Sequence, residues 1–376
     1  MRKKWIAAGL IISAIALTAC GNKEAGGQKP DGAVETQEGT DAADAKTEEA
    51  AAEYKRVSYK DLSSKVVSLG EYKGLEGKRT VEEVTDENVE EEVWQIKKES
   101  SDLVDVDRAA KEKDVVVIDY TGYVDGKTTE ELQGKEYSLE IGSGNFVPGF
   151  EEQLIGTSAE EDLEVNLTFP DDYYEEIAGK EARFEVHVHK VQEYDAVNWD
   201  EDTLKEKLGY DSEADMTASV REELVAGAES EADANLDYDL INQVMDGSEF
   251  DIQDADVTAY TDEMLSEYKM YASMYGVDLQ TYLQTYLNAT EDQLREMYKE
   301  TAVFRVKLVL TLKEIADKEG LAISDEEYTA RAEQMVKQLG YEDVSALEAV
   351  YSRDMVEEQM LQEKATSLIR ENAVVS

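Results

Sequence analysis

Alternating apolar and polar residues predict four strands in the middle of the chain. Residues 114–127 begin with the run Val-Val-Val-Ile and reach an Asp-Gly pair at 125–126, a pattern typical of a strand that enters a tight turn. Segments 136–142, 162–170 and 182–191 alternate apolar and polar positions, which predicts three further strands that each bury one face. Together these segments predict a small β-rich domain.

A short helix is predicted between the second and third of these strands. Pro148 stands near the start of the segment, and Phe150, Leu154 and Ile155 recur at helical spacing. Strands that bend around one short helix, with aromatic residues facing inward, form an apolar cup. Such a cup is either a packed core or a ligand pocket, and composition does not decide between the two.

The last third of the chain is predicted to be helical, because apolar residues recur at helical spacing and no proline follows Asp195. One helix is expected over 301–321, with Lys318 and Gly320 at its end, and Ser324 is expected to cap the next. Residues 259–287 are rich in methionine and tyrosine: Met264, Met270, Met274, Tyr260, Tyr268, Tyr271, Tyr275, Tyr282 and Tyr286. This stretch is either helical core or an adaptable binding face.

The N-terminal segment has the pattern of a targeting signal. Three basic residues at positions 2–4 precede an apolar run over 5–17, which is short for a membrane-spanning helix. The run ends in Leu17-Thr18-Ala19-Cys20, which resembles the lipobox of bacterial lipoproteins. The resemblance implies cleavage before Cys20 and a diacylglycerol on its sulfur; the alternative is an ordinary signal peptide with an incidental cysteine. Residues 21–53 lack aromatic residues, so we expect a flexible tether there.

Charge and rare residues exclude several classes of function. The formal charge of the 376-residue chain is -49, with 87 acidic and 38 basic residues, which disfavours binding to phosphate backbones. One cysteine and two histidines predict neither a disulfide framework nor a zinc site. His187 and His189 share the outer face of a predicted strand, and we expect them to face solvent. No catalytic triad, CxxC pair or phosphate-binding glycine loop is present, so no cofactor or metal is expected.

The β-rich motifs resemble a known family. The segments VVVIDYTGYVDGK, YSLEIGSGNFVPGFEEQLIG and LTFPDDYYEEIAGKEARFEVHVHKV are similar to FKBP-type peptidyl-prolyl isomerase domains, and more closely to the isomerase domain of the trigger factor family. The resemblance covers about residues 111–194. It extends upstream through 67–93 and, with weaker motifs, into the helical C-terminal part.

The resemblance implies a fold class, an activity and a set of site residues. The fold is an α+β arrangement in which an FKBP-like bent antiparallel sheet with a short helix precedes a mainly helical, chaperone-type C-terminal domain. The activity is cis–trans isomerisation of X-Pro bonds. The residues expected to line the pocket or its rim are Tyr120, Tyr137, Phe146, Val147, Phe150, Tyr173 (with Tyr174 as the alternative register) and Phe184.

One departure from the family concerns the turn after Gly126. Where family members carry an aromatic and an acidic residue that face the pocket, this chain has Thr129 and Glu130. One wall is lost, so three functional alternatives stay open: an active isomerase that also binds unfolded clients, a holdase chaperone with a decayed pocket, and a surface lipoprotein that captures a partner or ligand.

The motifs also predict an order of domains. We expect a lipoprotein signal over 1–19, a tether over 20–55, a trigger-factor-like lead-in over 56–110, the isomerase domain over 111–194 and a helical domain over 195–376. The expected location is the extracytoplasmic face of the cell membrane, and the expected partners are unfolded or nascent secreted polypeptides. Neither nucleic acid nor the ribosome is an expected partner, since only the signal and the tether precede the lead-in.

Overall fold

The computed structural model describes residues 56–376, so the predicted signal, Cys20 and the tether lie outside the described residues. The chain is divided into two compact units, each of which makes most of its backbone contacts within itself. One comprises residues 83–228, and the other brings residues 56–82 together with residues 229–376. The domain boundaries expected at residues 110 and 194 remain predictions.

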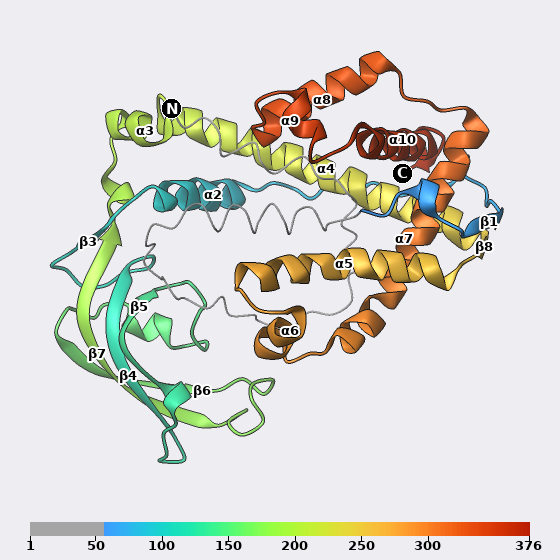
Figure 1. Cartoon of the computed structure of the whole chain (residues 1–376). Helices are drawn as coiled ribbons and strands as arrows, with labels where there is room; N and C mark the ends of the chain where they lie inside the picture. Colours follow the sequence, from blue (N-terminus) through green and yellow to red (C-terminus); the bar gives the residue numbers. More distant parts are fainter. Residues whose placement is uncertain (1–55) are drawn as a thin grey trace. The chain divides into compact units, whose positions relative to one another are not determined.

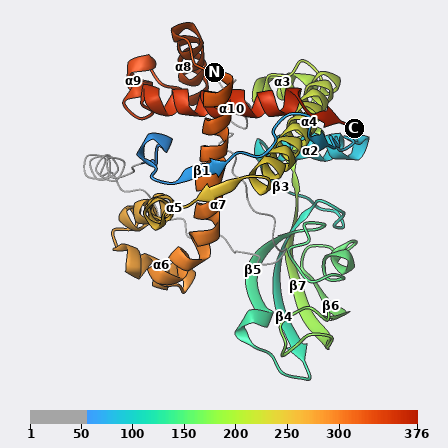
Figure 2. The ribbon, with the colours of Figure 1, turned by 90° about the vertical axis from the view of Figure 1, so that its right-hand side faces the viewer.

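The unit of residues 83–228 is built on an antiparallel sheet (Figures 1 and 2). Its strand order is β3-β7-β4-β5. Strand β6 pairs with residues 181–188 of β7, on the same edge on which β3 pairs with residues 192–194. The strands are β3 (Leu103–Asp105), β4 (Val115–Val124), β5 (Gln133–Glu140), β6 (Glu161–Thr168) and β7 (Glu181–Tyr194). The four strands predicted from the sequence are confirmed.

Local sequence explains how β4 ends. Asp125 and Gly126 both have positive φ, 52° and 72°, and Val124 bridges Lys127 across them. This is the backbone that an Asp-Gly pair adopts most readily in a two-residue hairpin turn. The 3-10 turn η2 (Glu130–Leu132) then leads directly into β5.

The short helix predicted near Pro148 is smaller than expected. It is the 3-10 turn η3 (Glu151–Leu154), and Pro148 lies three residues before it. Gly149 has a φ of +89°, which a right-handed helix does not tolerate, so the helical turn begins only after it. Phe150 and Leu154 are fully buried, as the apolar spacing predicts.

Three helical segments accompany the sheet within this unit: α2 (Asp86–Glu99), α3 (Glu201–Leu208) and the first part of α4 (Glu213–Asp246). Their shared core consists of Val89, Val93, Leu204, Met216 and Val220. Thr85 caps α2 through a reciprocal hydrogen-bonding pair with Asn88, and Asp200 caps α3. These caps satisfy amide groups that have no partner inside a helix.

The second unit is mainly helical. Its helices after α4 are α5 (Asp254–Met274), α6 (Leu279–Leu287), α7 (Glu291–Glu319), α8 (Asp325–Leu339), α9 (Val344–Glu348) and α10 (Arg353–Glu371). The predicted helix end at Gly320 and the cap at Ser324 are confirmed. None of the helices within residues 56–376 has the length and apolar character needed to cross a membrane.

Two short strand pairings join distant parts of the chain in this unit. Strand β1 (Lys65–Ser68) pairs with β8 (Glu249–Asp251), and β2 (Glu76–Gly77) runs parallel to β9 (Val374–Val375). Residues 65–77 therefore pair with segments from the C-terminal part of the chain.

Candidate functional site: an aromatic cluster on the sheet

Five aromatic rings, from three strands and the loop after β5, meet on the inner face of the sheet. Tyr120 is at the centre, with ring centroids 5.2 Å from Phe146, 6.2 Å from Phe150 and Tyr137, and 6.4 Å from Phe184. Phe146 lies 4.6 Å from Phe150. Most of these pairs meet edge to face, the geometry that aromatic quadrupoles favour. We call these five residues the aromatic cluster.

The cluster has a buried floor and an open rim. Phe150 and Phe184 are 0% and 4% exposed, and both belong to the core of the sheet. Tyr137 is 40% exposed, while Phe146 and Val147 are half-buried. Among residues 56–376, no backbone carbonyl accepts a hydrogen bond from the Val147 N–H. The rim therefore offers rings and a backbone donor to a ligand, above an apolar floor.

Two glycines create the space that two of these rings fill. Gly134 pairs with Tyr120 across β4 and β5, and a Cβ there would lie 2.3 Å from the ring carbon Cε1. Gly122 pairs with Phe184 across β4 and β7, and a Cβ there would lie 2.4 Å from that ring. Both rings therefore lie flat over the backbone, where any side chain would displace them.

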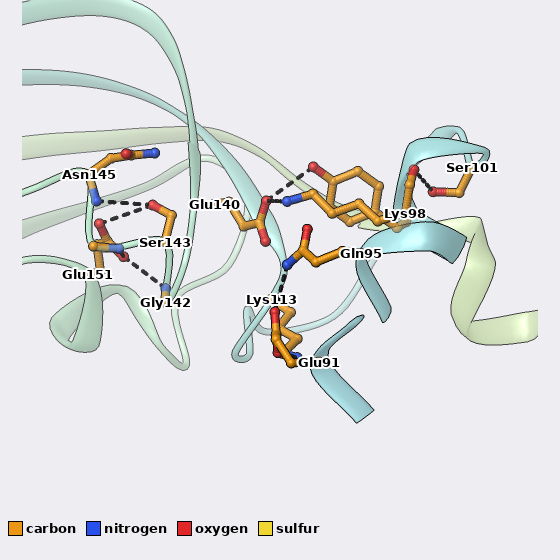
Figure 3. A network of polar contacts seen from close by, with 12 residues as sticks. Glu91, Gln95, Lys98, Ser101, Lys113, Glu140, Gly142, Ser143, Asn145 and Glu151 are labelled. Atoms are coloured by element: carbon orange, nitrogen blue, oxygen red, sulfur yellow. Dashed lines mark hydrogen bonds and ion pairs between the residues drawn. The ribbon is translucent and has the colours of Figure 1, made fainter. Parts of the chain in front are cut away.

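Glu151 organises the rim, and the sequence analysis did not identify it. Its carboxylate is 5% exposed and accepts backbone N–H hydrogen bonds from Gly142, Gly144 and Phe146 at 2.8, 3.1 and 3.0 Å. The Ser143 hydroxyl donates to it at 3.3 Å (Figure 3). One buried carboxylate thus fixes the loop that carries Phe146 and Val147. The sequence feature that could have identified Glu151 is an acidic residue in a predicted helix next to a glycine-rich loop.

Tyr173 lies apart from the aromatic cluster. Its ring contacts Phe169, at 4.9 Å between centroids, and the neighbouring Tyr174, also at 4.9 Å. Tyr173 is 39% and Tyr174 75% exposed. The structure thus brings together five of the six expected aromatic residues and leaves Tyr173 on the adjacent loop.

The turn that departs from the family pattern has a compensating residue. Thr129 and Glu130 are exposed, whereas Leu132, at the end of η2, is 9% exposed and packs in the core of the sheet. An apolar side chain thus reaches the core three residues after the position where the family carries its aromatic residue. The pattern of residues does not predict this, because a leucine in an acidic turn fits an exposed position equally well.

The tyrosine hydroxyls near the site are neutral hydrogen-bond donors. Burial raises the pKa of Tyr120, and the neighbouring Tyr137 adds to the shift; burial likewise raises the pKa of Tyr173. Both hydroxyls therefore stay neutral at physiological pH.

The outer face of the sheet carries two histidine–aspartate pairs. His187 Nδ1 lies 2.7 Å from Asp162 Oδ1, and His189 Nε2 lies 2.9 Å from Asp119 Oδ1. Across residues 56–376, no group of three or more His, Cys, Asp or Glu side chains is arranged to hold a metal ion.

A second polar network fixes the end of β5 beside α2. The Lys98 ammonium and the Tyr194 hydroxyl both donate to Glu140 (Figure 3). Burial, with a contribution from Glu140, raises the pKa of Tyr194 to about 12, so its hydroxyl remains a donor. Ile141, the next residue after Glu140, is 1% exposed. The network thus holds the strand that presents Tyr137.

The bent sheet, the rings on its inner face and the loop over them define an FKBP-type peptidyl-prolyl isomerase. The family model of FKBP-type isomerases matches residues 106–189, and that of the bacterial trigger factor C-terminus matches residues 212–371. The protein is therefore a peptidyl-prolyl cis–trans isomerase of the FKBP type.

Comparison with curated proteins identifies the family of the whole chain. Trigger factors of Bacillus pumilus and Bacillus subtilis are each 36% identical over 309 residues, which cover 81% of this chain and 73% of theirs. The trigger factor of Clostridium tetani is 36% identical over 313 residues, 82% of this chain and 72% of its own. The chain belongs to the trigger factor family.

A solved structure is also similar to the chain. It is described as "Promiscuous Substrate Recognition in Folding and Assembly Activities of the Trigger Factor Chaperone" and covers 83% of this chain and 79% of its own, with 18% identity and a TM-score of 0.32. The family assignment therefore rests on the sequence relatives.

Proposed function

We propose that this chain is a membrane-anchored, extracytoplasmic folding factor that isomerises X-Pro bonds in unfolded client polypeptides and holds those clients through its helical part. The anchor is supported by one observation, the sequence Leu17-Thr18-Ala19-Cys20 directly after an apolar run. In this proposal the sulfur of Cys20 carries the lipid. More than one acyl chain is needed for stable anchoring.

The aromatic cluster performs the isomerisation in this proposal. The X-Pro bond has a barrier of about 18–20 kcal/mol, because rotation breaks the resonance of the amide. The twisted amide is less dipolar than the planar one, so water stabilises the ground state more than the transition state. Phe150 and Phe184 form an apolar floor that removes this solvation and so lowers the barrier.

The residues at the rim hold the substrate. Tyr137 and Phe146 lie 5.3 Å apart between centroids and contact the proline ring. The Val147 N–H donates to a carbonyl of the client, the Tyr120 hydroxyl is a second donor, and Tyr173 closes over the ligand from its loop. Glu151 keeps the Val147 loop in place before the client arrives, which reduces the entropy lost on binding.

The helical unit binds the unfolded chain in this proposal. The methionine- and tyrosine-rich helices α5 and α6 leave Met270, Met274 and Tyr275 exposed at 38%, 70% and 58%. Methionine repacks around varied shapes, which suits clients of many sequences. The charge of -49 keeps loaded complexes apart.

Cell fractionation tests the anchor. The full chain and its Cys20→Ala variant are expressed in a bacterial host, and their distribution between membrane and soluble fractions is measured. The parent is expected in the membrane fraction and the variant to be released. A variant that stays with membranes as firmly as the parent would contradict the lipid anchor.

The second candidate is a holdase whose isomerase site contributes little. The observation in its favour is Thr129, which stands where the family carries an aromatic wall. Acceleration of prolyl isomerisation in a short peptide by the purified full chain separates the candidates. Protection of an unfolded protein from aggregation, without such acceleration, would support the holdase.

A further inference from the structure

Four tyrosine rings from α5 and α6 form one continuous surface. Tyr271 stacks on Tyr282 with centroids 6.3 Å apart, and Tyr275 lies 5.8 Å from Tyr282 and 5.1 Å from Tyr286. Tyr282 and Tyr286 are 4.9 Å apart. We call these four residues the tyrosine patch. Figures 1 and 2 show α6 beside α5 in the helical unit.

Most of the tyrosine patch is not needed to fill the core beneath it. Leu265 and Leu283 are fully buried there, and Leu294 is 6% exposed. Tyr282 packs against this core, whereas Tyr271, Tyr275 and Tyr286 are 39%, 58% and 51% exposed. The core interpretation holds for part of the stretch, since Tyr260 and Tyr268 pack in cores.

The tyrosine patch is electrically neutral in a highly acidic chain. Helix α6, with the sequence LQTYLQTYL, has no charged residue, although the chain carries a formal charge of -49. The rings beside Tyr282 are those of Tyr271, Tyr275 and Tyr286, and burial together with these neighbours raises the pKa of Tyr282. A surface of this kind complements a neutral segment better than a charged one.

The tyrosine hydroxyls add hydrogen-bond donors to this surface. Tyr268 and Tyr298 satisfy each other, with 2.6 Å between their hydroxyl oxygens. Within residues 56–376, by contrast, the four hydroxyls of the tyrosine patch make no hydrogen bond to another residue. The patch thus combines exposed ring faces with free O–H donors and lacks charged groups.

From these features we infer that the tyrosine patch binds proline-rich, uncharged segments of client chains in the extended polyproline II conformation. Proline rings pack on aromatic faces, and aromatic-lined grooves recognise such segments because their conformation is formed before binding. Proline has no N–H, so these segments present mainly carbonyl acceptors, which the four phenols match. The inference rests on the proposed client-binding function and names its substrate class: the chain would hold the residue type on which its isomerase site acts.

Peptide binding tests the inference. The full chain is titrated into a fluorescein-labelled, uncharged peptide of twelve residues that is half proline, and fluorescence anisotropy is recorded. The same titration uses a peptide with every proline replaced by serine and a third peptide of equal length rich in lysine. The proline peptide is expected to bind at least about tenfold more tightly than the serine peptide. Equal affinity for the two, or tighter binding of the lysine peptide, would overturn the inference.

A double variant locates the binding. Tyr275→Ser/Tyr286→Ser removes two exposed rings and is expected to weaken binding of the proline peptide by about tenfold. Val350→Ser, at a residue 56% exposed elsewhere in the helical unit, is the control. Proline-peptide binding that survives in the double variant would assign it to another site, such as the aromatic cluster, and overturn the inference.

The double variant also distinguishes the inference from the proposed function. If it still prevents aggregation of an unfolded, proline-poor protein but loses the proline peptide, client binding and the inference both stand. If the parent binds no unfolded protein at all, the proposed function fails, whatever the peptides show.

Discussion

Gly134 lies directly across the sheet from Tyr120, and its missing side chain is what allows the Tyr120 ring to lie over the strand. A methyl group at Gly134 would approach ring carbon Cε1 to 2.3 Å, closer than any real contact. Tyr120, the central residue of the aromatic cluster, therefore keeps its position because Gly134 on the neighbouring strand has no Cβ atom. Gly122 and Phe184 repeat the arrangement on the other side of β4.

The variant Gly134→Ala is expected to displace the Tyr120 ring. Because the new methyl group overpacks the sheet, we expect a loss of about 1–3 kcal/mol in the free energy of unfolding. Isomerase kcat/KM should fall by about tenfold, since the ring no longer meets Phe146. Denaturant unfolding and a prolyl-peptide assay measure the two effects. Gly227→Ala, in helix α4 with open space around its Cβ position, is the control and should keep full activity.

The variant Glu151→Ala is expected to loosen the rim. It leaves the N–H groups of Gly142, Gly144 and Phe146 without their acceptor, so the Val147 loop loses its fixed geometry. We expect KM for a prolyl peptide to rise by about tenfold, with a smaller change in kcat. Glu151→Gln keeps one oxygen acceptor and should recover part of the loss.

The neighbouring Glu152 provides a matched control for Glu151. It is exposed and accepts a single hydrogen bond, from the Gly149 N–H at 3.0 Å. Glu152→Ala should leave KM unchanged. A folded Glu151→Ala protein with the KM of the parent would show that the carboxylate does not position the rim.

The variant Thr129→Phe tests whether the missing aromatic wall limits catalysis. Thr129 is exposed, so a larger side chain has room, and an added ring would extend the apolar surface around the substrate. We expect kcat/KM to rise by about threefold, measured against Thr128→Phe as the control. An unchanged rate in a folded variant would indicate that Leu132 already closes this side of the site.

The carboxyl group of Asp237 should make stability depend on pH. It is 18% exposed, and its Oδ1 lies 3.4 Å from Arg370 Nε. Burial raises its pKa from 3.8 to about 6, with Arg370 opposing the shift and Asp233 adding to it. The folded state thus holds this proton more tightly than the unfolded chain. The resulting stability is fully present at low pH and is lost as the pH rises through about 6.

The variant Asp237→Asn removes this dependence. We compare the melting temperature of the variant minus that of the parent at two pH values. This difference should be larger at about pH 7.5 than at about pH 4.5, because only the parent carries the buried charge at the higher pH. Asp239→Asn, at an exposed position of the same helix, controls for the loss of one negative charge. An equal difference at both pH values would argue against a buried, titrating Asp237.

The sequence predicted the elements whose causes are local. The strand of residues 115–124 follows from β-branched alternation, and its turn follows from the Asp-Gly pair at 125–126. The cap at Ser324 follows from a side chain that accepts a hydrogen bond from an amide of the first turn, and the end at Gly320 follows from the left-handed backbone, φ 66°, that glycine adopts readily. The resemblance to the family also predicted five aromatic residues that the structure brings together, and Tyr173, which lies apart from them.

Other features depend on residues that are distant in the sequence, and only the tertiary structure decided them. The places of Tyr120 and Phe184 depend on glycines of neighbouring strands, and Leu132 reaches the core because of the path that η2 takes. The methionine- and tyrosine-rich stretch divides into core and surface according to how α5, α6 and α7 pack. Periodicity reports which face of an element is apolar, whereas burial depends on what another segment places against that face, and that information is spread over the whole chain.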